Sequence, residues 1–533
     1  MPPSTVMSAG KRTRDFRAAY DRRTVLSVGA AGLLSLLSSG ASAEPLPLPP
    51  GGFGFDDVVD IARLNAAKDH SPLKMALRPP LADLNYDEYR AIRVNEPLRP
   101  LGQHGNRTFA LDLLPPGHVY RDPVGITVVH RDRMETVPFS FDHFRFDPPY
   151  FEGRDVVAEI GGTEGLNYSG FRLRHPLNSP DVLDEFVVFQ GASYFRAVAR
   201  NLGYGLAARG LALRTADPRG EEFPVFRHFW VVEPEPGDRE IVVHALLDSQ
   251  SCTGAFMYEI SPGETTVMNV RCKIFPRIEL VQTGIAPLTS MYFFGPERRA
   301  GIDDFRDAVH DSSGLQMITG DGTRLWRPLS NPRRVEVSAF QDDNPKGFGL
   351  TQRSRDFDYY QDAEARYDLR PSCWVEPLSD WGPGAVMLVE IPVENEFNDN
   401  VVSFWRPEQP LVPTEAGHDF VYRLHWCDEP PDSAPMARIH ATRVGRSIHT
   451  SEAQAIVIDF RKGSVNTDAV SPQAWVSTGE VKGLALRTLP GGDLVRASFK
   501  FFPGDATSAE MQLYLRREDA RASETWLYRW TAK

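Results

Sequence analysis

The stretch from His310 to Trp405 holds the residues best suited to chemistry, because aromatic side chains alternate there with carboxylates and arginines. Its members include Arg355, Asp358, Tyr359, Trp374, Trp381, Glu394, Glu396 and Asp399. Sugars present apolar C–H faces, which aromatic rings bind, and rims of hydroxyl groups, which carboxylates bind. Paired carboxylates also act as general acid and base in glycoside cleavage. Composition alone favours a simpler interpretation, in which these are core aromatics of a β-sandwich beside solvated loop charges.

Other catalytic signatures are missing from the sequence. It holds no G-x-G-x-x-G, no G-x-x-x-x-G-K-[ST], no H-E-x-x-H and no G-x-S-x-G motif. The four cysteines lie far apart without a C-x-x-C pair, and Cys272 falls on the apolar face of an alternating run. We therefore expect a buried thiol there, with a disulfide as the alternative, and neither a metal nor another cofactor.

The elements that must position these residues are strands. Short alternating runs separated by Gly, Pro, Asn and Asp begin near residue 105, and helical periodicity is confined to two short segments, one capped by Asp56 and one over Asp87–Val94. The strands are predicted over Ile126–His130, Phe223–Val232, Ile241–Leu247, Thr265–Phe275, Arg334–Phe340, Gly384–Ile391, Phe420–Trp426, Ala455–Phe460, Leu494–Phe502, Glu510–Leu515 and Thr525–Trp530. This pattern predicts an all-β protein.

The ends of the chain differ in character from its middle. Residues 1–43 combine basic side chains, a short apolar run and Ala41-Ser42-Ala43, which is typical of a secretory signal. Arg22-Arg23 before Thr24 favours the twin-arginine route, and a membrane anchor is the alternative. We expect a large sandwich over residues 44–415 and an immunoglobulin-like sandwich over 416–533. The net charge of −12 argues against a nucleic-acid partner.

Many short stretches, in order along nearly the whole mature chain, resemble one family. They include Gly191–Ala197, Tyr204–Ala212, Ala245–Ser249, Gly284–Met291, His310–Ser312, Arg327–Leu329, Asn344–Leu350, Arg355–Phe357, Arg370-Pro371, Trp374–Pro377, Glu390–Pro392 and Glu524–Tyr528. These stretches are similar to the periplasmic glucan biosynthesis proteins G and D, the MdoG/OpgD family. The twin-arginine leader looks more like that of the D members.

The resemblance implies a galactose-mutarotase-like N-terminal sandwich, an immunoglobulin-like C-terminal domain and a place in osmoregulated periplasmic glucan biosynthesis. It also implies inverting hydrolysis of β-1,2-glucan, with Asp399 as general acid, Asp311 as base and Glu396 as a neighbour that raises the pKa of the acid. Arg355, Asp358, Tyr359, Trp374 and Trp381 are the expected substrate contacts. Two departures from the family pattern, Arg324 in the 320–326 turn and a short 443–456 connection, could weaken or redirect that activity.

Two other functions are compatible with the same resemblance. One is a non-catalytic glucan-binding protein that assists the membrane glucan synthase. The other is a mutarotase-like sugar epimerase, which rests on fold analogy alone. Release of new reducing ends from linear β-1,2-glucan would separate the hydrolase from both.

Overall fold

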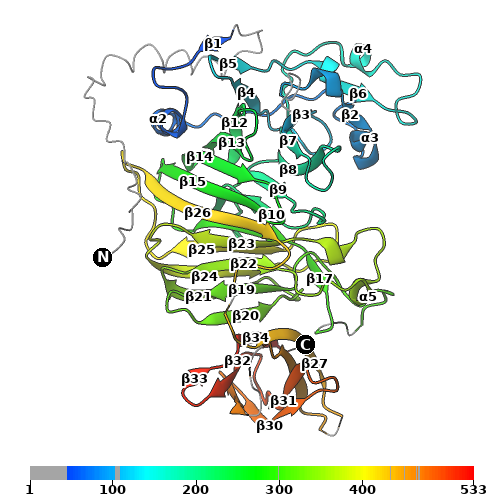
Figure 1. Ribbon diagram of the computed structural model, residues 1–533, viewed down its shortest axis with the longest axis vertical. Helices are drawn as coiled ribbons and strands as arrows, with labels where there is room; N and C mark the ends of the chain where they lie inside the picture. Colours follow the sequence, from blue (N-terminus) through cyan, green and yellow to red (C-terminus); the bar gives the residue numbers. More distant parts are fainter. Residues whose placement is uncertain are drawn as a thin grey trace, which may run out of the picture. The chain divides into compact units, whose positions relative to one another are not determined.

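Two large β-sheets form most of the protein. The computed structural model describes residues 45–101, 108–297, 299, 301–432, 434–448, 450–463, 465 and 469–532. The expected export signal, residues 1–43, lies outside the described residues. Strands dominate the described part of the chain, so the all-β prediction is confirmed (Figure 1).

The first sheet runs through the whole described chain. Its order is β1 (Leu46–Pro47), β5 (Arg133–Thr136), β4 (Gly125–Val129), β12 (Val225–Val232), β13 (Ile241–Asp248), β14 (Cys252–Ser261), β15 (Thr266–Pro276), β26 (His418–Cys427), β23 (Ser372–Pro377), β22 (Gly347–Thr351), β19 (Gly314–Ile318), β20 (Arg324–Pro328), β34 (Thr525–Thr531), β32 (Ser508–Arg517) and β29 (Ser471–Val476), with β33 (Ala520–Arg521) beside β32.

The second sheet faces the middle of the first. Its order is β21 (Glu336–Asp343), β24 (Pro383–Glu390), β25 (Val401–Pro407), β16 (Thr283–Ser290), β10 (Ala207–Arg209), β9 (Tyr194–Ala197), β8 (Asp184–Gln190), β7 (Gly170–His175) and β3 (Ala110–Leu114), with β11 (Ala212–Leu213) beside β16. Rings from both sheets meet in one core, as where Phe189 of β8 packs 5.3 Å from Tyr258 of β14 between ring centroids.

Smaller elements complete the fold. The pairs are β17 (Tyr292–Phe294) with β18 (Val309–His310), and β2 (Ile92–Val94) with β6 (Phe144–Phe146). The helices are α2 (Phe55–Ala66), α3 (Tyr86–Arg90), α4 (Val156–Ile160), α5 (Phe357–Tyr360) and the 3-10 turns η1 (Glu96–Leu98), η2 (Phe141–His143) and η3 (Tyr367–Leu369). In the described part of the chain, none of these is long and apolar enough to cross a membrane.

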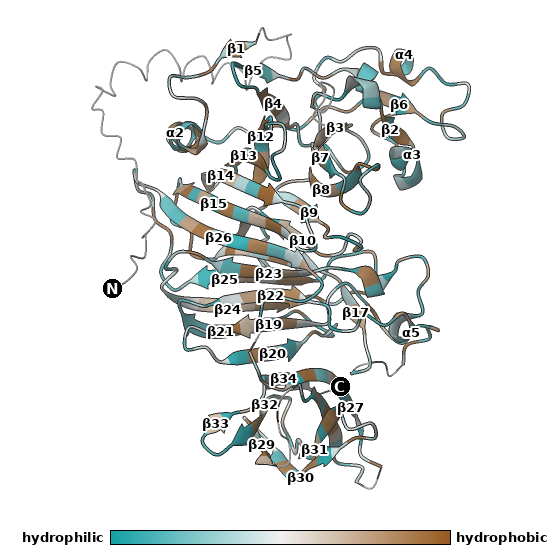
Figure 2. Ribbon diagram, in the orientation of Figure 1, coloured by the Kyte–Doolittle hydropathy of each residue, from teal (hydrophilic) through white to brown (hydrophobic). Residues whose placement is uncertain are grey.

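Alternation along the strands decides which residues are buried. In β15, Met268, Val270, Cys272 and Ile274 are buried, whereas the residues between them are partly exposed. Figure 2 shows how hydropathy changes along the strands. Cys272 is therefore on the apolar face, as predicted. The other three cysteines are also buried, and all four are free thiols.

A second sandwich lies towards the C-terminus. The four-stranded sheet β27 (Arg438–Arg446), β28 (Gln454–Arg461), β31 (Leu494–Phe502) and β30 (Glu480–Thr488) packs on β34, β32 and β29 around its own apolar cluster. Trp526 of β34 lies in this cluster. The same residue pairs in parallel with Trp326 of β20, so the two sandwiches share a continuous sheet (Figure 1).

Three local predictions need correction. The cap of α2 is Gly54, whose amide donates to Asp57 Oδ2 at 2.8 Å, and Asp56 lies inside the first turn. The helix predicted over Asp87–Val94 ends at Arg90, because Ile92–Val94 pairs with β6.

The third correction concerns β26. This strand was expected in the C-terminal domain, but it pairs with β15 and β23 in the large sheet. A boundary at residue 416 would therefore separate strands that hydrogen-bond to one another.

Candidate functional site

Asp311 and Asp399 are positioned by the same short segment of the chain. The amide of Asp311, which follows β18, donates to the carbonyl of Met291 at 2.9 Å. The amide of Asn400, the residue after Asp399, donates to the carbonyl of Ser290 at 3.0 Å. The two carboxylates are thus tied to adjacent residues at the end of β16.

Asn400 locks this arrangement through its side chain. Its Oδ1 accepts from the amide of Tyr292 at 2.8 Å, and its Nδ2 donates to the carbonyls of Tyr292 and Ile391. The side chain is completely buried. The Asn-Asp-Asn sequence is therefore held in place by Asn400, just before β25 begins, and the side chain of Asp399 remains partly exposed.

The two carboxylates differ in exposure and have different arginine partners. The Asp311 side chain is 12% exposed and its Oδ1 lies 3.4 Å from Arg370 Nε. The Asp399 side chain is 28% exposed and its Oδ2 lies 3.4 Å from Arg196 Nη2. Asp399 is the more accessible to a substrate.

Burial governs the acidity of Asp311. It raises the pKa of this carboxyl from 3.8 to about 6; Arg370 opposes the rise, and the negative charge of Asp399 adds to it. A carboxyl with such a pKa exchanges protons near neutral pH, as an acid–base group must. The pKa also shows that the two carboxylates are electrostatically coupled.

Glu396 belongs to a separate ion cluster at the edge of the site. Both of its oxygens contact Arg306, at 2.6 and 3.2 Å, and the same guanidinium binds Asp304 and Asp362. Hydrogen bonds, first that to Asp304, raise the pKa of Arg306. The charge of Glu396 reaches Asp311 and helps to raise its pKa. This cluster ties the segment around Arg306 to the loop that leads to Asp399.

Two phenylalanines beside this ion pair project into solvent. Phe305, next to Arg306, is 80% exposed, and Phe397, next to Glu396, is 87% exposed. The ring of Phe305 lies 5.9 Å from the Arg306 guanidinium carbon. A pair of exposed rings held beside a carboxylate site is suited to the apolar face of a sugar.

The predicted aromatic contacts lie in different surroundings. Trp381 is in the core between the sheets, packed on Trp405, Phe420 and Tyr422. Trp374 is buried on the other face of its sheet, over Gly347, where a Cβ would come within 2.3 Å of the indole. Tyr359 is half-buried beside His310, the neighbour of Asp311, with 6.1 Å between ring centroids.

The two charged residues of that prediction also have local partners. Arg355 Nε lies 2.6 Å from Asp428 Oδ1, and its guanidinium donates to the carbonyls of Arg370 and Asp428. Asp358 is exposed on α5 and accepts from Gln361 at 3.0 Å. Of the five residues, Tyr359 packs beside the neighbour of Asp311, and Arg355 contacts the backbone of Arg370, the partner of Asp311.

The two departures from the family pattern are also accounted for locally. Arg324 forms a bidentate ion pair with the buried carboxylate of Asp432, with nitrogen–oxygen distances between 2.9 and 3.1 Å. It therefore has a structural role at the junction with the second sandwich. The connection from β27 to β28 is short, since β27 ends at Arg446 and β28 begins at Gln454.

Several residues at the site were not singled out from the sequence. Arg196 and Arg370 both lie in stretches that carry the family resemblance, yet nothing in those stretches assigns them a carboxylate partner. Tyr367 stacks against Arg370, 5.3 Å from ring centroid to guanidinium carbon, and burial followed by Glu396 and Asp311 raises its pKa. Tyr194 is nearby, since Asp399 contributes to its raised pKa after burial and Glu221. Among the described residues, no group of three His, Cys, Asp or Glu side chains could hold a metal ion.

Comparison with known proteins covers almost the entire described chain. A family model described as "Periplasmic glucan biosynthesis protein, MdoG" matches residues 53–530. The chain is 45% identical over 484 residues to glucans biosynthesis protein G of Vibrio cholerae serotype O1, which covers 90% of this chain and 87% of that protein. It is 42% identical over 485 residues to glucans biosynthesis protein G of Shewanella sp. strain MR-7, with the same coverage.

Proposed function

The chain belongs to the MdoG family of periplasmic glucan biosynthesis proteins, and on that premise we propose that it controls the backbone of osmoregulated periplasmic glucan by inverting hydrolysis of β-1,2-linked glucose. The observation that carries this proposal is the coupled pair Asp311 and Asp399, tied to adjacent residues at the end of β16. A general acid and a general base on opposite faces of the bond are what inversion requires.

Asp311 serves as the base in this proposal. With a pKa near 6 it is a stronger base than an ordinary aspartate, and it is still mostly ionised at neutral pH. Arg370 keeps the ionised form accessible and fixes the direction of the carboxylate. Its task is to take a proton from the water that attacks the anomeric carbon.

Asp399 serves as the acid and gives its proton to the glycosidic oxygen of the leaving sugar. Arg196 stabilises the carboxylate that is left after this transfer. Phe305 and Phe397 offer faces for glucosyl rings at the edge of the site. Glu396, held by Arg306, contributes negative charge and positions the loop, without itself exchanging a proton.

The remaining features of the chain fit a periplasmic role. Residues 1–43 would direct export through the twin-arginine pathway and, with Arg22-Arg23, resemble the leader of the D members. The large sandwich would bind glucan and the C-terminal sandwich would form an immunoglobulin-like domain that begins after β26. The membrane glucan synthase would be the source of the polymer.

The competing function is a non-catalytic glucan-binding protein that assists the synthase. Both functions predict that the protein binds linear β-1,2-glucan, so binding alone does not separate them. The test is to incubate the purified protein with that glucan and count reducing ends, in wild type and in Asp399→Asn. We expect release by the wild type and none by the variant, which still binds. Binding without release by the wild type would favour the second function.

A further inference from the structure

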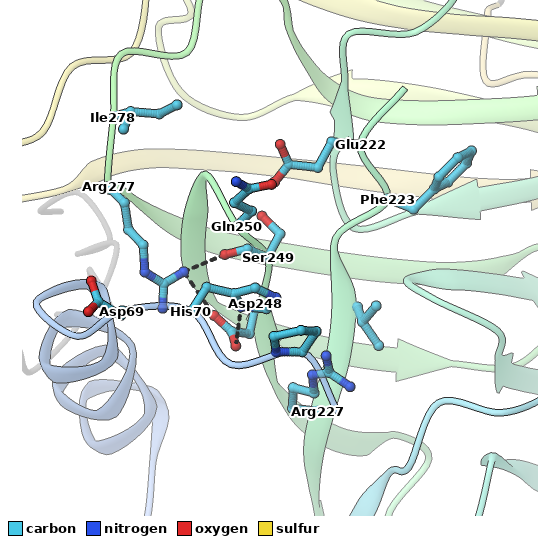
Figure 3. A pocket seen from close by; sticks show the side chains of 12 residues that line it. Asp69, His70, Glu222, Phe223, Arg227, Asp248, Ser249, Gln250, Arg277 and Ile278 are labelled. Atoms are coloured by element: carbon cyan, nitrogen blue, oxygen red, sulfur yellow. Dashed lines mark hydrogen bonds and ion pairs between the residues drawn. The ribbon is translucent and has the colours of Figure 1, made fainter. Parts of the chain in front are cut away.

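One pocket is lined by residues other than those of the carboxylate pair. It has a volume of about 770 Å³ and opens between the segment after α2, the approach to β12, the turn from β13 to β14, and the end of β15 (Figure 3). Its walls carry Asp69, His70, Glu222, Phe223, Arg227, Asp248, Gln250, Arg277 and Ile278 among others.

Most of the charges on these walls are already matched. Asp248 lies 3.2 Å from His70 Nδ1 and 3.0 Å from Arg277 Nη1 (Figure 3). Glu222 accepts from both the amide and the hydroxyl of Ser251, at 2.8 and 2.6 Å. Because these side chains already have polar partners, the pocket favours a neutral ligand that can both donate and accept hydrogen bonds.

Arg277 makes the pocket wall rigid. Its Nη2 donates to the carbonyl of Asn65 in the last turn of α2, at 2.9 Å. Its Nε donates to the carbonyl of Lys68, just after that helix, at 3.0 Å. A guanidinium at a helix C-terminus is favoured by the free carbonyls and the helix dipole. The polar wall is therefore preformed.

Arg227 has hydrogen-bonding capacity left over. Its side chain is 9% exposed, its Nη1 donates to the carbonyl of Leu73 at 3.0 Å, and its ion pair with Asp122 is long at 3.9 Å. Its Nε has no hydrogen-bond partner within the described part of the chain. Arg227 therefore supplies a fixed guanidinium group to the pocket wall.

The mouth of the pocket supplies apolar faces. Phe223 is 50% exposed and Ile278 is also exposed, although both line the hollow. An aromatic face beside matched polar groups has the two properties needed to bind a sugar ring, which is apolar on its faces and polar at its edges.

A single arginine joins this pocket to the carboxylate site. The Arg209 guanidinium carbon lies 5.6 Å from the Phe223 ring centroid and 4.5 Å from that of Tyr194. Arg209 is buried and fixed by Glu221 and Thr289. Tyr194 shares a face of β9 with Arg196, the partner of Asp399, because one residue lies between them in the strand.

We propose that this pocket is a second saccharide subsite, which holds a distant part of the same glucan chain whose linkage lies between Asp311 and Asp399. The inference rests on the proposed function, since it assigns an additional stretch of the same substrate. It predicts that affinity depends on chain length beyond the units that fill the carboxylate site.

The test uses the whole protein and linear β-1,2-gluco-oligosaccharides of increasing length, with binding measured by calorimetry. To prevent turnover, all proteins carry Asp399→Asn, including the reference. In the reference we expect affinity to rise again once the chain is long enough to reach the pocket. Adding Phe223→Ala should remove that second rise, an effect of about tenfold for the long chains, and leave short chains within about twofold.

Two further variants make the result specific. Phe223→Tyr keeps the ring and should restore the long-chain affinity, and Trp475→Ala removes an exposed aromatic of β29 and should change nothing. Equal affinity of Phe223→Ala and the reference at every length would overturn the subsite, as would an equal loss for short and long chains. If the reference binds no glucan of any length, the proposed function itself fails.

Discussion

The backbone beside Asp311 and the backbone beside Asp399 are hydrogen-bonded to two adjacent residues. The carbonyl of Met291 accepts from the amide of Asp311, and the carbonyl of Ser290 accepts from the amide of Asn400, which follows Asp399. Burial raises the pKa of Asp311 to about 6, and the charge of Asp399, which this backbone arrangement brings near, adds to the rise. Two acidic groups far apart in sequence thereby come close enough for the charge of one to act on the other. Five measurements follow from this geometry and from the contacts around it.

The first concerns the pH dependence of hydrolysis. If Asp311 is the base it must be ionised, so kcat/KM should rise with pH through a midpoint near 6. Arg370 lowers the pKa of Asp311, so Arg370→Met should move this midpoint to higher pH by about one unit. Arg370→Lys keeps the charge and should move it less. An unchanged midpoint in Arg370→Met would argue against Asp311 as the base.

The second concerns stability. The folded pKa of Asp311 lies above its unfolded value, so its ionisation opposes folding as pH rises from about 4 through about 6. Asp311→Asn should therefore stabilise the protein at pH 8, by up to about 3 kcal/mol, and should have little effect below pH 4. Denaturant unfolding at the two pH values measures this difference. A variant that is less stable at pH 8, or whose effect is independent of pH, would contradict the electrostatic account.

The third concerns the ion cluster at the edge of the site. Arg306→Met leaves Glu396, Asp304 and Asp362 without their shared cation, so the loop before Asp399 should loosen. We expect activity to fall about tenfold and amide hydrogen exchange over residues 392–399 to become faster. Arg154→Met breaks an exposed ion pair with Glu159, beside α4, and is the control. Similar activities of the two variants would show that the cluster does not position the site.

The fourth concerns the junction between the sandwiches. Glu524 is buried, pairs with Arg353 at 2.7 and 2.8 Å and accepts from the amide of Ile439. The guanidinium of Arg353 also lies 3.6 Å from the ring centroid of Trp326. Glu524→Ala should cost about 3–5 kcal/mol in unfolding, because a buried cation loses its partner.

The control for that variant is Glu510→Ala. Glu510 forms an exposed ion pair with Arg529 in the same sandwich, at 3.1 Å, and its loss should cost no more than about 1 kcal/mol. Equal losses for the two variants would mean that the pair of Arg353 and Glu524 does not stabilise the junction.

The strands could be predicted from the sequence because each one alternates between a buried and an exposed face. This rule placed Cys272 correctly, and it predicts the surroundings of Trp374 too. Cys373 and Val375 face the core between the sheets, so Trp374 must face the other way. Its neighbours there, Gly347 and Gly349, come from a strand that sequence order alone does not place beside it.

Residue types between His310 and Trp405 predict substrate contacts less well, because sugar binding and core packing use the same kinds of side chain. Trp381 has the chemistry of a sugar platform but fills the core, and Arg355 pairs with Asp428. The stretches that resemble the family also contain residues whose partners are structural. Arg327 and Glu390, each in one of those stretches, form a completely buried ion pair at 3.1 Å and stabilise the fold.

The contacts that define the site are long-range, which is why they could not be read along the chain. Arg196 and Asp399 are 203 residues apart, and Arg306 and Glu396 are 90 apart. The pairing of β9 with β10, of β10 with β16 and of β16 with β25 brings Arg196 and Asp399 together. The charged residues of the site could therefore be identified from the sequence, but which of them contact one another could not.

The fifth and most direct measurement is the configuration of the first product. Proton NMR of the wild type acting on linear β-1,2-glucan, recorded before mutarotation equilibrates the anomers, should show the α-anomer at the new reducing end. That result requires both cleavage and inversion by an acid and a base on opposite faces. An initial β-anomer, or glucan that is bound but never cleaved, would contradict the assignment of Asp399 and Asp311.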